Sequence, residues 1–309
     1  MHPPPFRFGL SKSTAATRRE LGAAARRAEA VGYSSLVAAD HLGILAPFTA
    51  AAVAACATER IRVGPFVLNN DFWHPALMAR EAATLDLLSD GRLELGMGAG
   101  HMKTEYEAIG LAFHPAWERI ERLAESVRLV KRLLSGERVT YRGRFYQLEQ
   151  HQLSPLPPQG SSLPVLIGGN GDRLLAVAAR EADIVGFSGF LPGRDGTDPS
   201  PTHFTSAGLS DRIDHVRREA GERFSELELN VLVQRVVVTS DRRSAAQHLS
   251  VSWPPAQEIL DSPFVLLGTV EEIIDQLQEH RERLGVSYWV VFEGRSEGFD
   301  QVVERLAGT

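Results

Sequence analysis

The chain has little cysteine, no long apolar run and no excess of positive charge. Its 309 residues contain a single cysteine, Cys56. One cysteine excludes a disulfide within the chain and any cysteine-based metal site, which is typical of proteins from a reducing compartment. Cys56 lies in an alanine-rich segment, and we expect it to be a small buried apolar residue.

Sequence signals for a membrane span or for secretion are also missing. The longest apolar run, near residues 44–57, is too short to cross a bilayer and contains Pro47 and Thr49. The first residues have neither the basic region nor the apolar region of a signal peptide. We therefore expect a cytoplasmic protein that does not bind membranes.

The charge balance argues against nucleic acid as a partner. The formal net charge is −6, with 33 Lys and Arg against 39 Asp and Glu. A surface that binds phosphate backbones needs the opposite excess. The apolar content of 43% is enough for one large core.

Short apolar segments alternate with amphipathic ones along the whole chain. Strands that are apolar on both faces and are each followed by a helix predict a parallel sheet covered by helices. About eight such units favour an α/β fold of the (β/α)8 TIM-barrel type, in one domain over residues 1–309, with an insertion at about 136–163 and a flexible loop at about 189–206. The predicted strands are 6–10, 35–39, 61–68, 93–97, 164–167, 183–187, 228–238 and 287–292, and the predicted helices are 14–31, 47–58, 75–88, 117–134, 173–180, 209–220, 241–249, 269–284 and 298–306.

Several residues mark the ends of these helices. Gly32 is suited to a left-handed cap at the end of the first helix. Pro47 falls in the first turn of the second helix. Thr269 and Glu272 have the spacing of a capping box, so a helix is expected to begin there.

In such a barrel the active site lies at the C-terminal ends of the strands. Titratable, aromatic and glycine residues are concentrated at those predicted ends. They include Asp40, His41, Asn69, Trp73, His74, the glycine run that ends at His101, residues 168–172, Phe187 and Phe190.

The strand over 93–97 leads into three glycines spaced two apart, Gly96, Gly98 and Gly100. Glycine at such a place either adopts dihedral angles closed to other residues or lets a ligand lie against the main chain. The third glycine comes one residue too early for the G-x-G-x-x-G dinucleotide motif, so a Rossmann site is rejected. The chain also has no Walker loop and no G-x-S-x-G elbow.

The segment from Gly168 to Asp172 is the best phosphate-binding candidate. Glycines before a helix expose backbone N–H groups beside the positive end of the helix dipole, and Arg173 could add charge. The alternative is an ordinary tight turn capped by Asn170 or Asp172. The residues leave both interpretations open.

Asp40 and His41 are the best acid–base candidates. A histidine exchanges protons near neutral pH, and a neighbouring carboxylate can orient its ring. The alternative is an Asp helix cap beside a surface histidine. His74 and His101 have the same ambiguity, and no pair of histidines shows the i, i+4 spacing of a helical zinc site, so no metal is expected.

Taken together, several segments resemble the bacterial luciferase-like superfamily, most closely its coenzyme F420-dependent oxidoreductases. The resemblance covers nearly the whole chain in order, although each motif alone is modest. The segments that carry it are 32–41, 74–92, 95–106, 133–136, 141–146, 164–171 and 267–269.

This resemblance implies a barrel with a flavin or deazaflavin lying across the strand ends. By position His41 matches a proton-transfer histidine of some F420-dependent dehydrogenases, while His101 stands where some relatives have a glutamate. Relatives often have a non-prolyl cis peptide in the stretch that matches residues 66–69. The implied cofactor contacts are Asp40 with Val67, Leu68 and Asn69 at the ring, Ala99 and Gly100 at the ribityl chain, and Gly168, Gly169, Asn170 and Gly171 at the phosphate.

The implied activity is hydride transfer from reduced F420 to a small organic or natural-product substrate with an activated C=C or C=N bond. His41 or His101 would supply the proton, and Trp73, Phe187 and Phe190 would shape the substrate pocket. Two alternatives stay open: an FMN-dependent monooxygenase that uses O2, and a flavin-binding barrel without catalysis. Members of this superfamily commonly dimerise, so a homodimer is expected.

Overall fold

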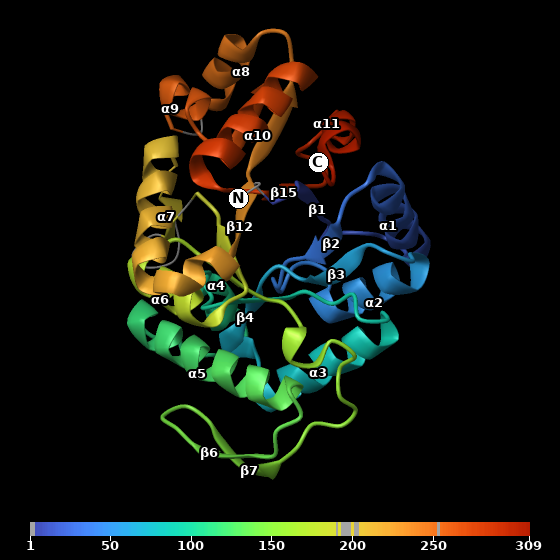
Figure 1. Ribbon diagram of the computed structural model, residues 1–309, viewed down its shortest axis with the longest axis vertical. Helices are drawn as coiled ribbons and strands as arrows, with labels where there is room; N and C mark the ends of the chain where they lie inside the picture. The colour runs from blue at the N-terminus through green and yellow to red at the C-terminus, as the bar shows by residue number, and fades with distance from the viewer. Residues whose placement is uncertain (1–3, 190, 193–198, 201–203, 252–253) are drawn as a thin grey trace.

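A computed structural model describes residues 4–189, 191–192, 199–200, 204–251 and 254–309 (Figure 1). Within these residues, a nine-stranded parallel sheet has the order β3-β2-β1-β15-β12-β9-β8-β5-β4. Its strands are β1 (Arg7–Ser11), β2 (Ser35–Ala38), β3 (Arg62–Pro65), β4 (Leu68–Asn69), β5 (Leu95–Gly98), β8 (Val165–Gly168), β9 (Ile184–Phe187), β12 (Glu228–Val233) and β15 (Tyr288–Phe292).

The sheet closes into a barrel because β3 and β4 are two halves of one interrupted strand. β3 pairs with β2 on one side, whereas β4 pairs with β5 on the other. A bridge between Val63 and Leu93 adds to the closure. The interruption contains a cis peptide bond between Phe66 and Val67, within the stretch where the family resemblance led us to expect one. The nine segments therefore make eight barrel strands, which confirms the (β/α)8 prediction.

Helices surround the barrel on the outside (Figure 1). Each barrel strand leads into one of them, which buries an apolar face against the sheet. They are α1 (Arg18–Val31), α2 (Pro47–Ala57), α3 (Pro75–Leu88), α5 (Ala116–Leu134), α6 (Asp172–Glu181), α7 (Ser206–Ala220), α10 (Val270–Leu284) and α11 (Asp300–Leu306).

Shorter elements fill the connections. The predicted insertion at about 136–163 contains a hairpin of β6 (Val139–Arg142) paired with β7 (Gln147–His151), which lies outside α5 (Figure 1). A short antiparallel pair, β10 (Leu191–Pro192) with β11 (Pro199–Ser200), falls in the predicted loop at 189–206, much of which lies outside the described residues. The other elements are α4 (Lys103–Ala108), β13 (Arg235–Val238), α8 (Arg242–Leu249), α9 (Ala256–Leu260), β14 (Val265–Gly268) and the 3-10 turns η1 (Asn70–Phe72), η2 (Gly160–Ser162) and η3 (Gly221–Glu226).

Two predicted strands are each divided in the structure. The strand predicted over 61–68 becomes β3 and β4, and the one over 228–238 becomes β12 and β13. Gln234 lies between the latter two, and its backbone N–H donates to Phe264 O at 2.7 Å instead of continuing the barrel ladder. β13 then pairs with β14, a strand that the sequence analysis did not predict.

The helix-end signals are confirmed. Gly32 caps α1 with a φ of 107°, and Pro47 opens α2. Thr269 and Glu272 form a complete capping box at the start of α10. The prediction for Cys56 was wrong, because its side chain is exposed near the end of α2 rather than buried. The alanine-rich sequence of α2 gives little contrast between its faces, so the pattern did not indicate which one points outward.

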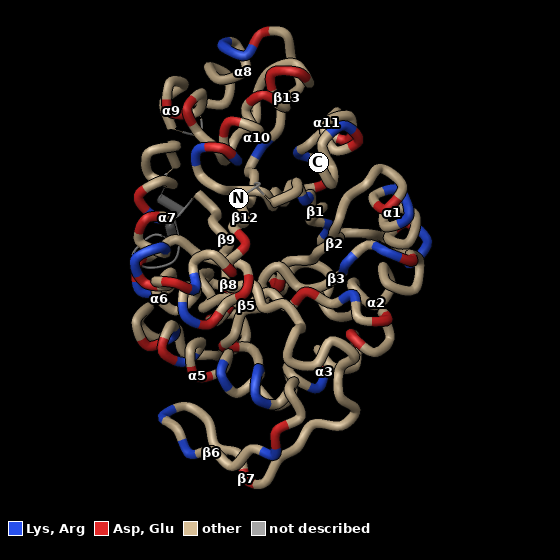
Figure 2. Tube along the Cα trace, viewed as in Figure 1, with Lys and Arg blue, Asp and Glu red and all other residues tan. Residues whose placement is uncertain are grey.

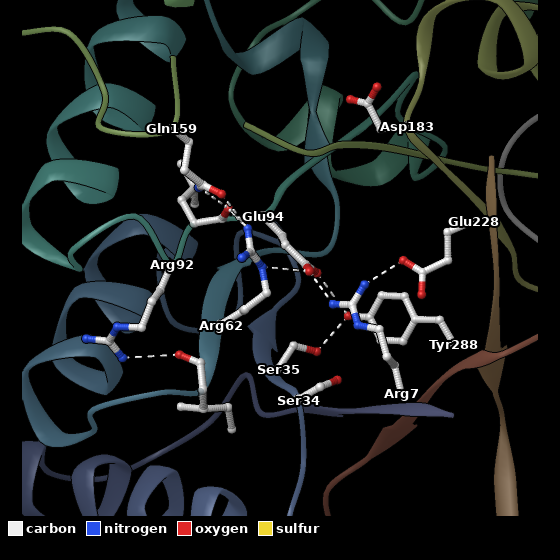
Figure 3. A network of polar contacts seen from close by, with 12 residues as sticks. Arg7, Ser34, Ser35, Arg62, Arg92, Glu94, Gln159, Asp183, Glu228 and Tyr288 are labelled. Carbon is white, nitrogen blue, oxygen red and sulfur yellow. Dashed lines mark hydrogen bonds and ion pairs between the residues drawn. The ribbon is translucent and has the colours of Figure 1, made fainter. Parts of the chain in front are cut away.

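The N-terminal end of the barrel is closed by a network of charged side chains, which we call the barrel floor: Arg7, Ser35, Arg62, Glu94, Glu228 and Tyr288 (Figure 3). Arg7 forms ion pairs with Glu94 and Glu228. A further ion pair joins Arg62 Nε to Glu94 Oε1 at 2.9 Å. Tyr288 donates to Glu94 Oε2 at 3.2 Å, and burial raises the pKa of this tyrosine, so it stays a neutral donor. Because five of these six residues begin barrel strands and Glu94 directly precedes β5, the network lies opposite the predicted active site.

On the outer surface acidic and basic residues are mixed (Figure 2). Most of their ion pairs join exposed side chains, such as Arg144 with Glu121, and contribute little to stability. Among the described residues, no helix combines the length and the apolar character of a membrane span.

His280 on α10 gives the fold a dependence on pH. Its side chain is buried against Trp289, with ring centroids 5.7 Å apart, and burial lowers its pKa to about 4. The unfolded chain binds a proton at this residue near pH 6.5. Between these two values the unfolded state holds more protons, so the stability contributed here is present above pH 6.5 and is lost as the pH falls.

We therefore expect the free energy of unfolding to fall by about 2 kcal/mol between pH 6.5 and 5 through this residue. Urea unfolding at both pH values measures it. In His280→Leu this decrease should be smaller by the same amount, whereas His248→Leu, which changes an exposed histidine on α8, should behave as the unchanged protein does. An equal decrease in all three proteins would contradict the assignment.

Candidate active site

His41 follows β2 and is held by a carboxylate from α4. Its Nδ1 lies 3.1 Å from both Oε1 and Oε2 of Glu105. Glu105 Oε1 also accepts the backbone N–H of Leu42 at 3.0 Å, so the same carboxylate fixes the loop and the ring. A histidine with one nitrogen held in this way can exchange a proton through the other nitrogen.

His101, after β5, lies beside His41. The two ring centroids are 5.6 Å apart, and the rings are nearly perpendicular. Desolvation lowers the pKa of His101, and the neighbouring His41 and Arg119 act in the same direction, while Glu105 opposes them. At neutral pH His101 is therefore uncharged. The structure thus brings together the two histidines that the sequence analysis selected.

Asp40 is not a helix cap, because α2 begins only at Pro47. Its Oδ2 accepts hydrogen bonds from Trp73 Nε1 and from the backbone N–H of Asn69, both at 3.0 Å. Burial raises the pKa of Asp40, and these two donors oppose the shift. Trp73 thus orients Asp40. The Trp73 ring packs against the Phe48 ring, and the two ring centroids are 5.3 Å apart.

The three spaced glycines have different tasks. A Cβ at Gly96 would come within 2.4 Å of a backbone oxygen of β3, and one at Gly98 within 2.6 Å of a Val67 methyl group. These two glycines therefore make room for the neighbouring interrupted strand rather than for a ligand. Gly168 also borders Val67, since a Cβ at Gly168 would lie 3.3 Å from Val67 Cγ1.

Gly100 is the glycine of this run with a left-handed conformation, at φ 72°. A Cβ there would also lie 2.1 Å from the Tyr106 hydroxyl and 2.4 Å from Asn69 Oδ1. Tyr106 donates to Asn69 at 2.9 Å, which ties the end of β4 to α4. The backbone of Ala99, just before, accepts from Arg119 Nε at 3.3 Å. The turn after β5 is therefore held tightly from several sides, and Leu68 beneath it is fully buried.

The segment 168–171 leads into α6 with no side-chain cap. Gly171 is the N-cap residue, so neither Asn170 nor Asp172 caps the helix as the alternative interpretation required. Gly169 donates its N–H to Gly186, and no atom of the described residues lies within 4 Å of a Cβ position on Gly171. Within the described part of the chain, no side chain therefore caps the first backbone N–H groups of α6, which are the kind of donors that bind an anion.

Arg212 from α7, which the sequence analysis did not select, lies at this segment. Its guanidinium donates to Asn170 Oδ1, and its Nε donates to Gly208 O at 3.0 Å. It also lies 5.7 Å from the centre of the Phe187 ring. Burial lowers the pKa of Arg212 to about 10, so it keeps its charge at neutral pH. Asn170 further donates to Ser188 Oγ at 2.7 Å.

Arg173, the charge proposed from the sequence for this segment, points elsewhere. It is exposed and lines a surface groove of about 580 Å³ between α5, α6 and the β6–β7 hairpin. Trp117, Tyr141 and Phe145 line the same groove. The groove lies outside the ring of helices and does not include the residues at the strand ends.

Of the three predicted pocket aromatics, Trp73 is partly exposed and Phe187 is 1% exposed. Phe190 lies outside the described residues.

His74 acts as the N-cap of α3, with its Nδ1 accepting from Ala76 N at 3.3 Å. Among the residues that the structure describes, no cluster of three His, Cys, Asp or Glu side chains could hold a metal ion.

Glu105 and Arg212 are the site residues that sequence reasoning missed. Arg212 falls at a core-facing position of its helix, between Leu209 and Val216, and this spacing could have indicated a buried charge. Glu105 gave no comparable signal, because its partner His41 lies 64 residues away.

Comparison with known proteins gives the class of this barrel. The family model of the luciferase-like monooxygenases matches residues 4–262. The chain belongs to this family. It is 30% identical to the F420-dependent glucose-6-phosphate dehydrogenase of Nakamurella multipartita over 322 aligned positions, which cover 99% of this chain and 88% of that relative. The enzyme of the same name from Segniliparus rotundus is 32% identical, over 92% of this chain and 90% of its own length.

Solved structures agree on the fold. The coenzyme F420-dependent tetrahydromethanopterin reductase of Methanopyrus kandleri superimposes with a TM-score of 0.79 at 19% identity, covering 99% of this chain and 98% of the reductase. An F420-dependent secondary alcohol dehydrogenase has a TM-score of 0.76 at 18% identity, over 98% of each chain. At these identities the likeness supports the (β/α)8 barrel and nothing finer.

Proposed function

We propose that this chain is an F420-dependent oxidoreductase that transfers hydride between the deazaflavin and a small organic substrate, working as a reductase of an activated C=C or C=N bond. The observation that carries the proposal is the pair His41 and His101 at the strand ends, with Glu105 behind His41. Hydride chemistry needs such a proton carrier beside the reacting carbon. The F420-dependent relatives supply the choice of cofactor.

The residues at the strand ends fit a phosphate-bearing flavin analogue. The open start of α6 offers backbone donors, and the buried cation Arg212 lies beside Asn170 next to it. The Val67 side chain lies against both Gly98 of β5 and Gly168 of β8, so it links the ends of these two strands. One continuous sector of the rim, from β2 through β4 and β5 to β8, thus carries the implied contacts.

A bound deazaflavin would supply the hydride, and the chain would supply position and protons. Asp40, oriented by Trp73 and Asn69, would hold the ring side of the cofactor. His41, in its doubly protonated form, would give one proton to the substrate atom next to the one that accepts hydride and would be left as a neutral ring. His101, uncharged at neutral pH, would accept a hydrogen bond or relay a proton without adding a second positive charge.

The proposal predicts binding of F420 and weak binding of FMN. Titrating the purified protein with each cofactor and following the quenching of cofactor fluorescence measures both dissociation constants. Arg212→Ala should weaken F420 binding, because the phosphate loses a buried cation. Arg173→Ala, which changes the exposed arginine of the outer groove, is the matched control and should leave binding unchanged. Tight FMN binding without F420 binding would instead favour the FMN-dependent monooxygenase.

A further inference from the structure

Glu105 is the acid that contacts His41 at the rim. Its side chain is 12% exposed, against 33% for that of His41. Glu107, two residues further along α4, is exposed and pairs with Lys103 at 3.5 Å, so it does not face the site. One acid of this short helix is thus directed at the loop after β2, and the other is directed at solvent.

The contact selects one form of the histidine. An ionised carboxylate only accepts hydrogen bonds, so the nitrogen that faces Glu105 must carry the hydrogen. Nδ1 of His41 is that nitrogen, at 3.1 Å from both carboxylate oxygens. Nε2 is then the nitrogen that exchanges a proton with a bound molecule. The other charged or titratable groups near His41 are Asp40, His101 and, beside His101, Arg119. None of these three is hydrogen-bonded to His41 Nδ1.

We propose that Glu105 is a positioning residue that fixes the Nδ1–H form and the orientation of His41, so that proton transfer runs through Nε2. This inference rests on the proposed function for its catalytic meaning, although the pairing itself can be tested without a cofactor. Glu105 lies in the first turn of α4 and acts through His41 rather than on the substrate.

The form of the ring can be read directly. Protein labelled with ¹⁵N-histidine is studied by long-range ¹H–¹⁵N NMR at pH 8.5 without cofactor, and His41→Gln assigns the signals. We expect a protonated Nδ1 and an unprotonated Nε2 in the unchanged protein. In Glu105→Ala the ring should change to the Nε2–H form that free histidine prefers. Glu105→Gln keeps an acceptor oxygen and should retain the Nδ1–H form, and Glu107→Ala should match the unchanged protein.

A kinetic measurement separates positioning from a merely structural role. Glu105→Ala should lower kcat by about 10- to 100-fold, as expected when the partner that orients a functional histidine is lost, with the F420 dissociation constant unchanged. Glu105→Gln should recover part of that loss. An Nε2–H form of His41 in the unchanged protein would overturn the inference even if Glu105→Ala failed to fold. The inference would also be overturned if His41 kept the Nδ1–H form in a folded Glu105→Ala variant. Failure to bind F420 with the Nδ1–H form present would overturn the proposed function instead.

Discussion

Replacing Glu94 by alanine is expected to lower the free energy of unfolding by about 3 kcal/mol. Glu94 is 4% exposed and is the acid shared by Arg7 and Arg62 at the barrel floor (Figure 3). Removing it leaves two guanidinium groups, each about a quarter exposed, close together without their common counter-charge. Tyr288 also loses the acceptor of its hydroxyl.

Urea unfolding, followed by circular dichroism, measures this effect. Glu121→Ala breaks the exposed pair with Arg144 and serves as the matched control, for which no measurable change is expected. Glu94→Gln should fall between the two, because the amide keeps one acceptor for Tyr288 but loses the charge. If Glu94→Ala were as stable as Glu121→Ala, the floor would not depend on this acid.

Replacing His41 by alanine is expected to lower kcat by about 10²- to 10⁴-fold, the usual contribution of a general acid or base. Reduced F420 with cyclohex-2-enone is a suitable assay, since the enone has an activated C=C bond. The F420 dissociation constant should stay nearly unchanged, because proton transfer contributes to the transition state and not to cofactor binding.

His248→Ala, at an exposed position on α8, is the control for loss of a histidine and should turn over normally. His101→Ala tests which ring carries the proton. If His41→Ala weakened cofactor binding as much as it slowed turnover, His41 would be a binding residue. A loss of turnover in His101→Ala alone would transfer the acid role to that residue.

The barrel could be predicted because both sequence signals for it, the apolar strands and the amphipathic helices that follow them, are local. Runs such as Val165–Gly168 and Ile184–Phe187 are short and apolar, and each is followed by an amphipathic helix. The division of the segment at Phe66 and Val67 does not follow from local residue preferences, since neither residue is a turn former, and only the family resemblance indicated a cis peptide in this stretch. β14 was missed because its four apolar residues directly precede the capped start of α10 and were not separated from it.

The site was predicted less completely than the fold. Residues at strand ends, such as His41 and His101, follow from topology alone once a barrel is assumed. Side chains that reach the rim from helices do not, because Glu105 and Arg212 meet their partners only after the helices pack. In the glycine run, Gly100 has the left-handed conformation that was one of the two expected roles, whereas Gly96 and Gly98 accommodate Val67 and the β3 backbone.

Because the ion pairs lie at the N-terminal mouth of the barrel, sequence changes that affect stability and sequence changes that affect substrate preference fall at opposite ends of the molecule. Arg7, Glu94 and Glu228 hold that mouth shut from residues that begin or directly precede their strands. The residues that we propose take part in the reaction extend from the opposite mouth, at the far end of the same strands. We therefore expect that loops at this opposite mouth can be replaced to alter substrate preference, because the ion pairs at the N-terminal mouth keep the barrel stable.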